Sequence, residues 1–300
     1  MELTWLMRLR IAAAAAVGVV LIGVLAWPLA APPDSAGAVR SADISFNNTA
    51  ILLVVAFLAG YIAYFASWPY GREIGILAAP FGLTVWAGRS GSMASLIAIN
   101  PTVTQRQELF AALKWEPVFW LVVVAAGFAG VLAAQKTRSK SEPNETPEKA
   151  EANPGKYLNQ IIALAGSVLI AHFCIGLLAQ DVKIFDNKLG FVVGQPVIGQ
   201  IIFAVSVSFG LAAFLSKAIL NASYIWSSAA SGLVTALGIT IYGKQNLLEH
   251  LAKSWPATFF SNTVISVLPV QMVAFGTLGA VAGYWLAVRY NYWRKTSRTN

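Results

Sequence analysis

The sequence predicts an all-α integral membrane protein with about eight transmembrane helices, arranged as a tandem repeat of two four-helix halves. Of the 300 residues, 57% are hydrophobic and only 11% are charged, whereas soluble domains carry about 25% charged residues. The mean hydropathy is +0.64. The few charges also leave long uncharged runs between them. Most of the chain is therefore expected to lie in a lipid bilayer.

The uncharged runs locate the spans, because a helix needs about 20 apolar residues to cross the bilayer core. The runs are 11–33, 44–71, 74–88, 90–105, 117–135, 157–180, 189–216, 218–243 and 254–288. Two of them, 74–88 and 90–105, are short and meet at Arg89, so this region is either one span with Arg89 near its end or a re-entrant segment. The predicted spans are 11–31, 50–69, 74–92, 117–135, 157–180, 196–216, 224–242 and 265–288.

The first apolar run resembles a secretory signal in its flanks. Arg8 and Arg10 precede it and Ala36-Gly37-Ala38 follows it, as in a signal peptide with its cleavage site. The run continues from Ile11 to Ala31, however, whereas a signal core has roughly 7 to 15 residues. We therefore expect a retained span.

The positions of Lys and Arg predict the orientation. With eight spans and a cytoplasmic N-terminus, most of the 21 basic residues fall on the inner side, as the positive-inside rule requires. These inner residues are Arg8, Arg10, Arg72, Lys136, Arg138, Lys140, Lys149, Lys156, Lys217, Arg289, Arg294, Lys295 and Arg298. Both termini are thus predicted to be cytoplasmic, in the plasma membrane. The net charge of +8 needs no nucleic-acid partner, since no dense basic face is present.

Glycines at matching positions indicate an internal duplication. A shift of 150 residues superposes Gly60 on Gly210 and Gly88 on Gly238, and near the end of each half a shift of 149 superposes Gly130 on Gly279. The halves are then 1–135 and 157–300. Four spans in each make the two copies parallel.

Two further segments complete the expected architecture. Residues 107–117 and 246–256 are amphipathic, end in Trp and Pro, and are predicted as interfacial helices on the outer surface. The linker 136–156 is rich in Pro, Glu, Lys, Ser and Asn, so we expect it to be disordered and cytoplasmic. It acts as a spacer or, alternatively, as a phosphorylatable segment.

Few side chains are available for chemistry. No Asp or Glu lies well inside a predicted span, which weighs against a proton-driven carrier. A single Cys, Cys174, and two His, His172 and His250, leave no multi-Cys metal site. We therefore expect no metal and no cofactor, and an enzyme is less favoured than a transporter.

The candidates for a substrate-binding site or pathway are the polar residues of the spans. Arg89 can present its guanidinium to an anion, or can extend to the headgroups. His172 is a possible ligand or proton relay, or a packing residue. Ser223, Ser227, Ser231 and Thr235 recur every four residues along one helix face, which either lines a polar path or packs against another helix. The second span adds Tyr61 and Tyr64.

One pattern resembles an enzyme family. Gly88-Arg89-Ser90-Gly91 resembles the G-x-S-G of rhomboid-type intramembrane proteases, and Ala171-His172 resembles their Ala-His pair. The resemblance implies a Ser90 nucleophile with His172 as its base. Against it, the predicted spans place Ser90 at an outer end and His172 near mid-depth, beyond the hydrogen-bond reach that such a pair needs.

The leading expectation is a small permease or channel-like transporter without an acidic proton-coupling site. The alternative is a non-transporting subunit whose small-residue faces dock partner subunits in the bilayer. The two differ in what lies between the halves: a water-accessible path along the serine stripe favours transport, and a dry contact there opposes transport.

Overall fold

The computed structural model of the protein describes residues 4–32, 37–139, 154–255 and 259–299. Within this part the chain is almost entirely helical, with one small sheet. Seven helices are long and apolar enough to cross a membrane: Trp5–Leu25, Phe46–Ala66, Val103–Arg138, Tyr157–Leu178, Ile198–Leu220, Tyr224–Tyr242 and Pro269–Ser297. The prediction of a multi-pass membrane protein is therefore supported by the fold.

The first half contains seven helices and four shorter helical segments. They are α1 (Trp5–Gly18), the π-helical η1 (Val19–Leu25), η2 (Trp27–Leu29), η3 (Ser41–Asp43), α2 (Phe46–Ala66), α3 (Gly71–Ile74), η4 (Gly75–Leu77), α4 (Ala78–Arg89), α5 (Met93–Ile99), α6 (Val103–Leu113) and α7 (Glu116–Ser139). Side chains cap several of these helices. Ser45 accepts from the Asn48 N–H at the start of α2, and Thr102 and Gln105 form a capping box on α6.

The second half combines five helices with the sheet. Its elements are α8 (Pro154–Leu178), β1 (Lys183–Asp186), β2 (Gly190–Gly194), α9 (Ile198–Leu220), α10 (Tyr224–Tyr242), α11 (Gln245–Ser254), β3 (Phe259–Phe260), the short η5 (Thr263–Ser266) and α12 (Pro269–Thr299). The strands are antiparallel in the order β1-β2-β3. Asn221, in the left-handed conformation, ends α9.

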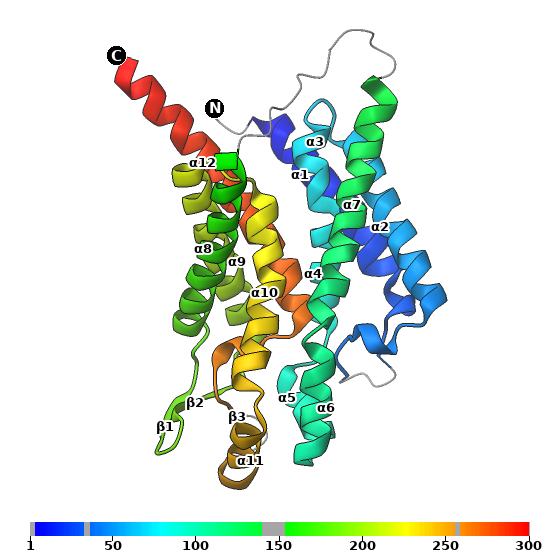
Figure 1. Ribbon diagram of the computed structural model, residues 1–300. Coiled ribbons are helices and arrows are strands. Elements are labelled where there is room, and N and C mark those ends of the chain that lie inside the picture. Colours follow the sequence, from blue (N-terminus) through cyan, green and yellow to red (C-terminus); the bar gives the residue numbers. More distant parts are fainter. Residues whose placement is uncertain (1–3, 33–36, 140–153, 256–258, 300) are drawn as a thin grey trace.

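The first helix starts and the last helix finishes at the same end of the molecule (Figure 1). The start of α1, the end of α7, the start of α8 and the end of α12 all lie there, and we call this the terminal end. The sheet, α5, α6 and α11 lie at the opposite end, which we call the sheet end. Seven positions of the predicted linker lie in helices, because α7 continues through Ser139 and α8 begins at Pro154. The linker is thus shorter than predicted, and its residues 140–153 lie outside the described part.

The predicted third span, 74–92, differs from a single long helix. The chain from Gly71 to Arg89 is helical without a break, but α3, η4 and α4 divide it and α4 alone has 12 residues. Gly75 sits where its Cβ would lie 3.1 Å from the Tyr64 N atom. This close approach of α2 accompanies the change of helix type.

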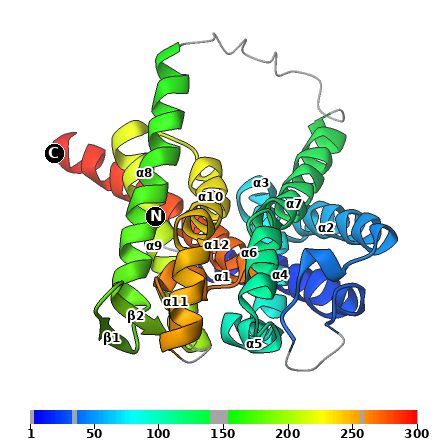
Figure 2. The same ribbon diagram turned by 60° about the horizontal axis from the view of Figure 1, so that its bottom comes forward.

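Both segments predicted as interfacial helices are helical, with shifted bounds, but α6 does not lie across the end of the bundle. It continues in the direction of α7, as both views show (Figures 1 and 2), and Val103–Arg138 forms one helical segment of 36 residues. Helices α6 and α11 contact each other at the sheet end. Part of the apolar face of each helix therefore packs against protein: Phe110 of α6 and Leu251 of α11 are both buried.

Glycines allow the closest helix pairs in both halves. A Cβ at Gly130 would lie 1.9 Å from the Phe57 carbonyl oxygen, so α7 touches the backbone of α2. A Cβ at Gly279 would lie 2.2 Å from the Ser206 carbonyl oxygen, so α12 touches α9 in the same way. Such contacts are typical of small-residue interfaces between membrane helices.

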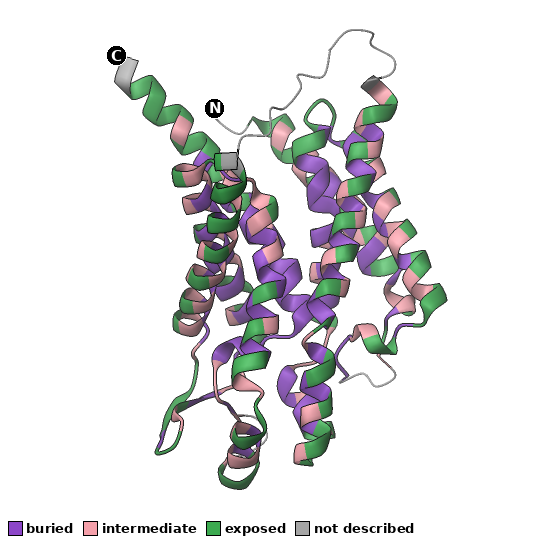
Figure 3. Cartoon of the chain, in the orientation of Figure 1, coloured by how far each residue is buried: buried purple, intermediate pink, exposed green. Residues whose placement is uncertain are grey.

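The buried core lies along the seam between the halves. There α12 packs against α4 and α7, and α10 packs against α7. Buried positions concentrate on these facing helices, whereas outward surfaces such as that of α8 are exposed (Figure 3). The exposed residues of α8 are large and apolar, among them Leu169 and Phe173, as expected of a lipid-facing helix.

Candidate functional site

Three members of the serine stripe of α10, Ser227, Ser231 and Thr235, are buried, and Ser223 at its start is partly exposed. Ser227 Oγ lies 2.8 Å from Ser167 Oγ of α8, and Ser167 lies 3.4 Å from Ser216 of α9. These three hydroxyls join α8, α9 and α10 in one hydrogen-bonded group. Such a group holds helices together in a bilayer, where an unsatisfied hydroxyl is costly.

The other members of the stripe bond within their own helix. Ser231 donates to the Ser228 carbonyl oxygen at 2.6 Å and Thr235 to that of Ser231 at 3.2 Å. Ser223 caps the start of α10 by accepting from the Ile225 N–H. The stripe thus serves packing and capping. Three of its four members are buried, which opposes the expectation of a polar transport path along this helix face.

His172 lies beside Tyr242 near the sheet end of α8. The two rings are stacked, with centroids 6.0 Å apart, and the Tyr242 hydroxyl lies 3.5 Å from His172 Nε2. The imidazole is half-buried between α8 and α10. This contact matches the packing role considered for His172.

Arg89 and Ser90 face the loop that follows the first span. The Arg89 guanidinium lies 4.5 Å from the centre of the Trp27 ring, and the arginine is otherwise exposed. Ser90 Oγ accepts from the Val39 N–H at 2.9 Å. No hydrogen bond joins Ser90 to His172 in the described part of the chain, so the pair that the protease resemblance implies is not assembled.

Tyr61 and Tyr64 lie beside the seam at the terminal end. Tyr64 is buried in an apolar cluster with Leu77, Val131 and Val281, and Tyr61 packs against that cluster. Val281 belongs to α12, so the cluster bridges the halves. Of the sequence candidates, these two tyrosines are the ones that the fold brings to the seam.

An apolar groove of about 620 Å³ opens beside this cluster. One wall comes from α1, η4 and α4, and the other from α9 and α12. The lining residues are Ile11, Leu77, Phe81, Ser206, Val207, Gly210, Leu211, Phe214, Leu278, Gly279, Ala282, Gly283, Trp285 and Leu286. Its volume is within the range of small-molecule sites, about 300–1,000 Å³.

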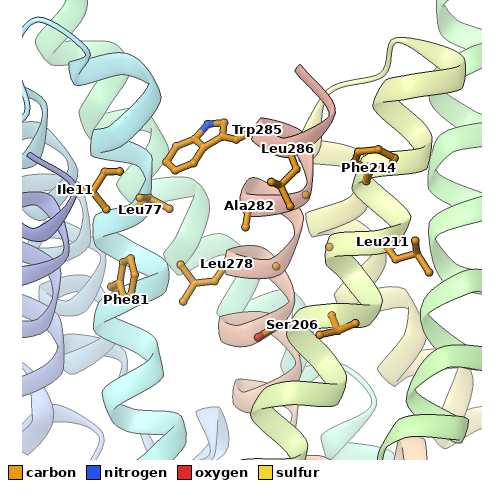
Figure 4. A pocket seen from close by; sticks show the side chains of 14 residues that line it. Ile11, Leu77, Phe81, Ser206, Leu211, Phe214, Leu278, Ala282, Trp285 and Leu286 are labelled. Atoms are coloured by element: carbon orange, nitrogen blue, oxygen red, sulfur yellow. The ribbon is translucent and has the colours of Figure 1, made fainter. Parts of the chain in front are cut away.

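Side chains from the two halves face each other across this interhalf groove (Figure 4). Ile11, Leu77 and Phe81 lie on one side, and Leu278 and Trp285 point toward them from α12. Ser206 supplies the one side-chain hydroxyl of the lining. Leu286 is 61% exposed, so the groove is open at its flank. An apolar, flank-open groove suits a lipid-like molecule and does not suit a hydrated ion.

The seam is closed toward the sheet end by two glutamines. Gln271 of α12 donates to the Ala87 carbonyl oxygen of α4 at 3.2 Å. Gln195 accepts from the Ala94 N–H at 3.0 Å and donates to the Ser266 carbonyl oxygen at 3.1 Å. Both therefore tie the first half to the second, and the groove lies between this closed region and the terminal end.

A second polar cluster lies outside the spans, at the sheet end. Asp186 accepts from Trp255 Nε1 at 2.6 Å, contacts His250 Nε2 at 3.0 Å, and accepts from the Lys188 and Leu189 N–H groups. The hydrogen bond from Trp255, with those from His250 and the two N–H groups, holds the pKa of Asp186 well below its usual range. The cluster fastens the β1–β2 hairpin to α11.

The groove had no signal in the sequence, and the burial of Glu116 had only a weak one. Ile11, Leu77 and Trp285 are ordinary apolar residues of three separate spans, and only their packing makes a site. Glu116, which precedes a predicted span, is buried with its Oε1 accepting from the Ser41 N–H and from Trp120 Nε1. Its neighbour Trp120 in α7, at the i+4 position, was the only hint of that contact.

Comparison with known protein families, with curated proteins and with solved structures finds no match for the chain. Its function has to be argued from the geometry described above.

Proposed function

We propose that the protein is a small membrane permease for an amphipathic, lipid-like substrate that binds in the interhalf groove. The observation that supports this proposal is the groove. It has a volume of about 620 Å³, its lining is apolar, and it is formed jointly by α1, η4 and α4 of one half and by α9 and α12 of the other. In transporters built from two repeats, the substrate site lies at the interface of the repeats. A groove of this composition selects acyl chains.

The contrast between the two ends of the seam supports transport over static binding. Toward the sheet end the halves are joined through Gln271 and Gln195, and toward the terminal end they enclose the groove. A carrier that alternates between openings needs such an asymmetric state, in which one end is closed while the other admits substrate.

The experiment is a lipid-translocation assay in liposomes. Purified protein is reconstituted with a phospholipid that carries a fluorescent label, and the rate at which the label crosses the bilayer is followed by its access to a quencher outside. Ala282→Trp fills the groove from an exposed position of α12, and Ala165→Trp places the same side chain on the exposed face of α8.

Wild type and the Ala165→Trp control are expected to move lipid faster than protein-free liposomes, and Ala282→Trp to lose most of that gain. A wild-type rate of lipid translocation equal to that of protein-free liposomes would contradict the permease proposal.

The second candidate is a non-transporting subunit, and the extent of the closed seam favours it. The serine stripe is dry, and α10 and α12 pack directly on α7. In this case the groove receives a transmembrane segment of a partner. A partner that co-purifies in mild detergent with wild type and not with Ala282→Trp, together with no lipid movement, would select this candidate.

We also infer eight spans in two parallel copies. The helical run from Gly71 to Arg89 has 19 residues, about 28 Å at 1.5 Å per residue, which is close to the bilayer core. The equivalence of the Gly130–Phe57 and Gly279–Ser206 contacts under a shift of 149 supports the repeat. The basic excess at the terminal end supports the inference that both termini are cytoplasmic.

A further inference from the structure

We propose that the interhalf groove binds an anionic phospholipid from the leaflet at the terminal end, with an acyl chain in the groove and the phosphate between Arg8 and Arg289. This inference rests on the proposed function, because it assigns the substrate class of the same site. The observations that support it are the length of the groove along its helices and the charges at its mouth.

The groove spans one leaflet. On α9 it extends from Ser206 to Phe214, and on α12 from Leu278 to Leu286. Each stretch spans eight steps along its helix, or about 12 Å along the helix axis at about 1.5 Å per residue. Half of the hydrocarbon core is about 15 Å. The groove therefore matches the length of acyl chain that one leaflet offers, and it ends where headgroups begin.

Arg8 and Arg289 lie at the mouth. Arg8 precedes Ile11 by three residues on α1, and Arg289 follows Leu286 by three residues on α12. Residues three apart on a helix share a face, so both arginines stand one turn beyond the lining. Both are exposed. Within the described residues, neither guanidinium takes part in a salt bridge, a side-chain hydrogen bond or a ring contact.

The charges around this mouth are strongly one-sided. Within five residues of a lining residue on α1, α3, α9 and α12, the chain carries five cations and one acid: Arg8, Arg10, Arg72, Lys217 and Arg289, with Glu73. Two of the five cations have other contacts: Arg10 lies over the Tyr70 ring and Lys217 bonds Asn221 Oδ1. Of the other three, Arg72 is five residues from its nearest lining residue, Leu77, whereas Arg8 and Arg289 are each three residues from one. Arg8 and Arg289 are therefore the two cations assigned to an anionic headgroup.

An anionic phospholipid fits both the apolar groove and the cations at its mouth. Its acyl chain removes apolar groove surface from water and from mismatched lipid contacts, and its phosphate accepts hydrogen bonds from guanidinium groups, which bind phosphate in a fork geometry. Basic pockets between membrane helices on the cytoplasmic side are known to select such headgroups. A zwitterionic headgroup also carries a phosphate, but its quaternary ammonium cancels the net charge, so the arginines attract such a lipid less strongly.

The test compares phosphatidylglycerol with phosphatidylcholine of the same acyl chains, bound to purified protein in detergent and counted by native mass spectrometry. The variants are Arg8→Gln, Arg289→Gln, their combination, Arg289→Lys and Ala282→Trp. The matched control for the lost charge is Lys136→Gln, an exposed cation at the end of α7 away from the groove, and that for the added bulk is Ala165→Trp. Thermal unfolding of each variant shows that it is folded.

Wild type and both controls are expected to retain phosphatidylglycerol in preference to phosphatidylcholine. Each arginine-to-glutamine change is expected to lower that preference about fivefold, Arg289→Lys is expected to lower it less, and Ala282→Trp is expected to reduce the binding of both lipids. Should Ala282→Trp disturb folding, Val207→Trp from the exposed face of α9 replaces it.

The outcomes separate the two proposals. Equal retention of both lipids in wild type, or an unchanged preference in the double arginine variant, overturns the anionic headgroup assignment and leaves the permease proposal to the translocation assay. Undiminished lipid binding in the groove-filling variants overturns the assignment as well, because the lipid then binds elsewhere. If lipids with either headgroup are translocated equally fast, the result supports the permease proposal and contradicts the role of Arg8 and Arg289 in selecting the headgroup.

Discussion

Glu116 shows how one side chain fixes a loop to the bundle. Its carboxylate is 4% exposed, and Oε1 accepts from the Ser41 N–H at 2.9 Å and from Trp120 Nε1 at 3.3 Å. The first hydrogen bond anchors η3, which precedes α2, and the second orients a fully buried ring. A buried donor that loses its acceptor bears the full desolvation penalty.

Glu116→Ala is therefore expected to lower the free energy of unfolding by about 1–3 kcal/mol, since the buried Trp120 N–H and the partly buried Ser41 N–H lose their acceptor. The measurement is equilibrium unfolding in mixed detergent micelles. Glu116→Gln keeps an acceptor oxygen and is the control, expected to lose clearly less. Equal losses for both variants would contradict a role for the accepted hydrogen bonds.

Asp186 gives a pH dependence whose sign follows from its lowered pKa. The hydrogen bond from Trp255 and the other donors favour the carboxylate in the folded protein. The stabilisation is thus fully present above the ordinary pKa of about 3.9 and is lost as the pH falls below it. The contact between the hairpin and α11 is expected to loosen in acid.

Hydrogen exchange of β1, β2 and α11 measures this, after correction for the intrinsic pH dependence of exchange. Wild type is expected to lose protection between about pH 4 and more acidic values, whereas Asp186→Asn is expected to have reduced protection at neutral pH and no further loss in acid. Protection that is the same in both proteins at neutral pH would show that the carboxylate does not hold the hairpin.

At the scale of elements, the α9–α12 pair depends on backbone approach. A Cβ at Gly283 would lie 1.9 Å from the Gly210 carbonyl oxygen, whereas a Cβ at Gly166 of α8 would have nothing within 4 Å. Gly283→Ala must separate the helices and is expected to cost about 1–3 kcal/mol. Gly166→Ala is expected to gain about 0.5–1 kcal/mol through helix propensity.

Detergent unfolding of the two variants, beside wild type, checks the pair. Opposite signs are expected, and a Gly283→Ala variant as stable as wild type would mean that α9 and α12 are not packed this closely.

The elements differ in how far the sequence could predict them. Uncharged runs located α2, α8, α9 and α10 well, because lipid imposes length and composition on a span. The run containing α3 and α4 was predicted as one helix, since the approach of α2 at Gly75 is not visible in hydropathy. The small sheet was not predicted: β1 and β2 have the β-forming Ile184, Phe185 and Val192, but short loops between spans carry no periodicity to reveal pairing.

For the site, polar residues were selected because buried polarity in a membrane is informative. Most of them are used for packing or capping, as with Ser227 and Ser223. The groove consists of apolar residues from four spans, which no local pattern distinguishes from lipid-facing positions. Only Tyr61 and Tyr64, chosen as a face of the second span, fall beside it.

For the whole molecule, the orientation of the bundle in the membrane is the property to test. In a Cys174→Ser background, Lys136→Cys lies at the end of α7 and Ser254→Cys at the end of α11, both exposed. With eight spans, a membrane-impermeant thiol reagent applied to intact cells is expected to label position 254 and not position 136. Labelling of both or of neither before the cells are opened would refute the eight-span arrangement.

The position of the four helix ends at the terminal end has a consequence for how the chain could be divided. Each half starts and finishes at that end, and the contacts between the halves along the seam are all non-covalent. A polypeptide cut between α7 and α8 loses none of these contacts. The two halves are therefore expected to associate as two separate subunits would, and the segment that connects them raises the effective concentration of one half around the other.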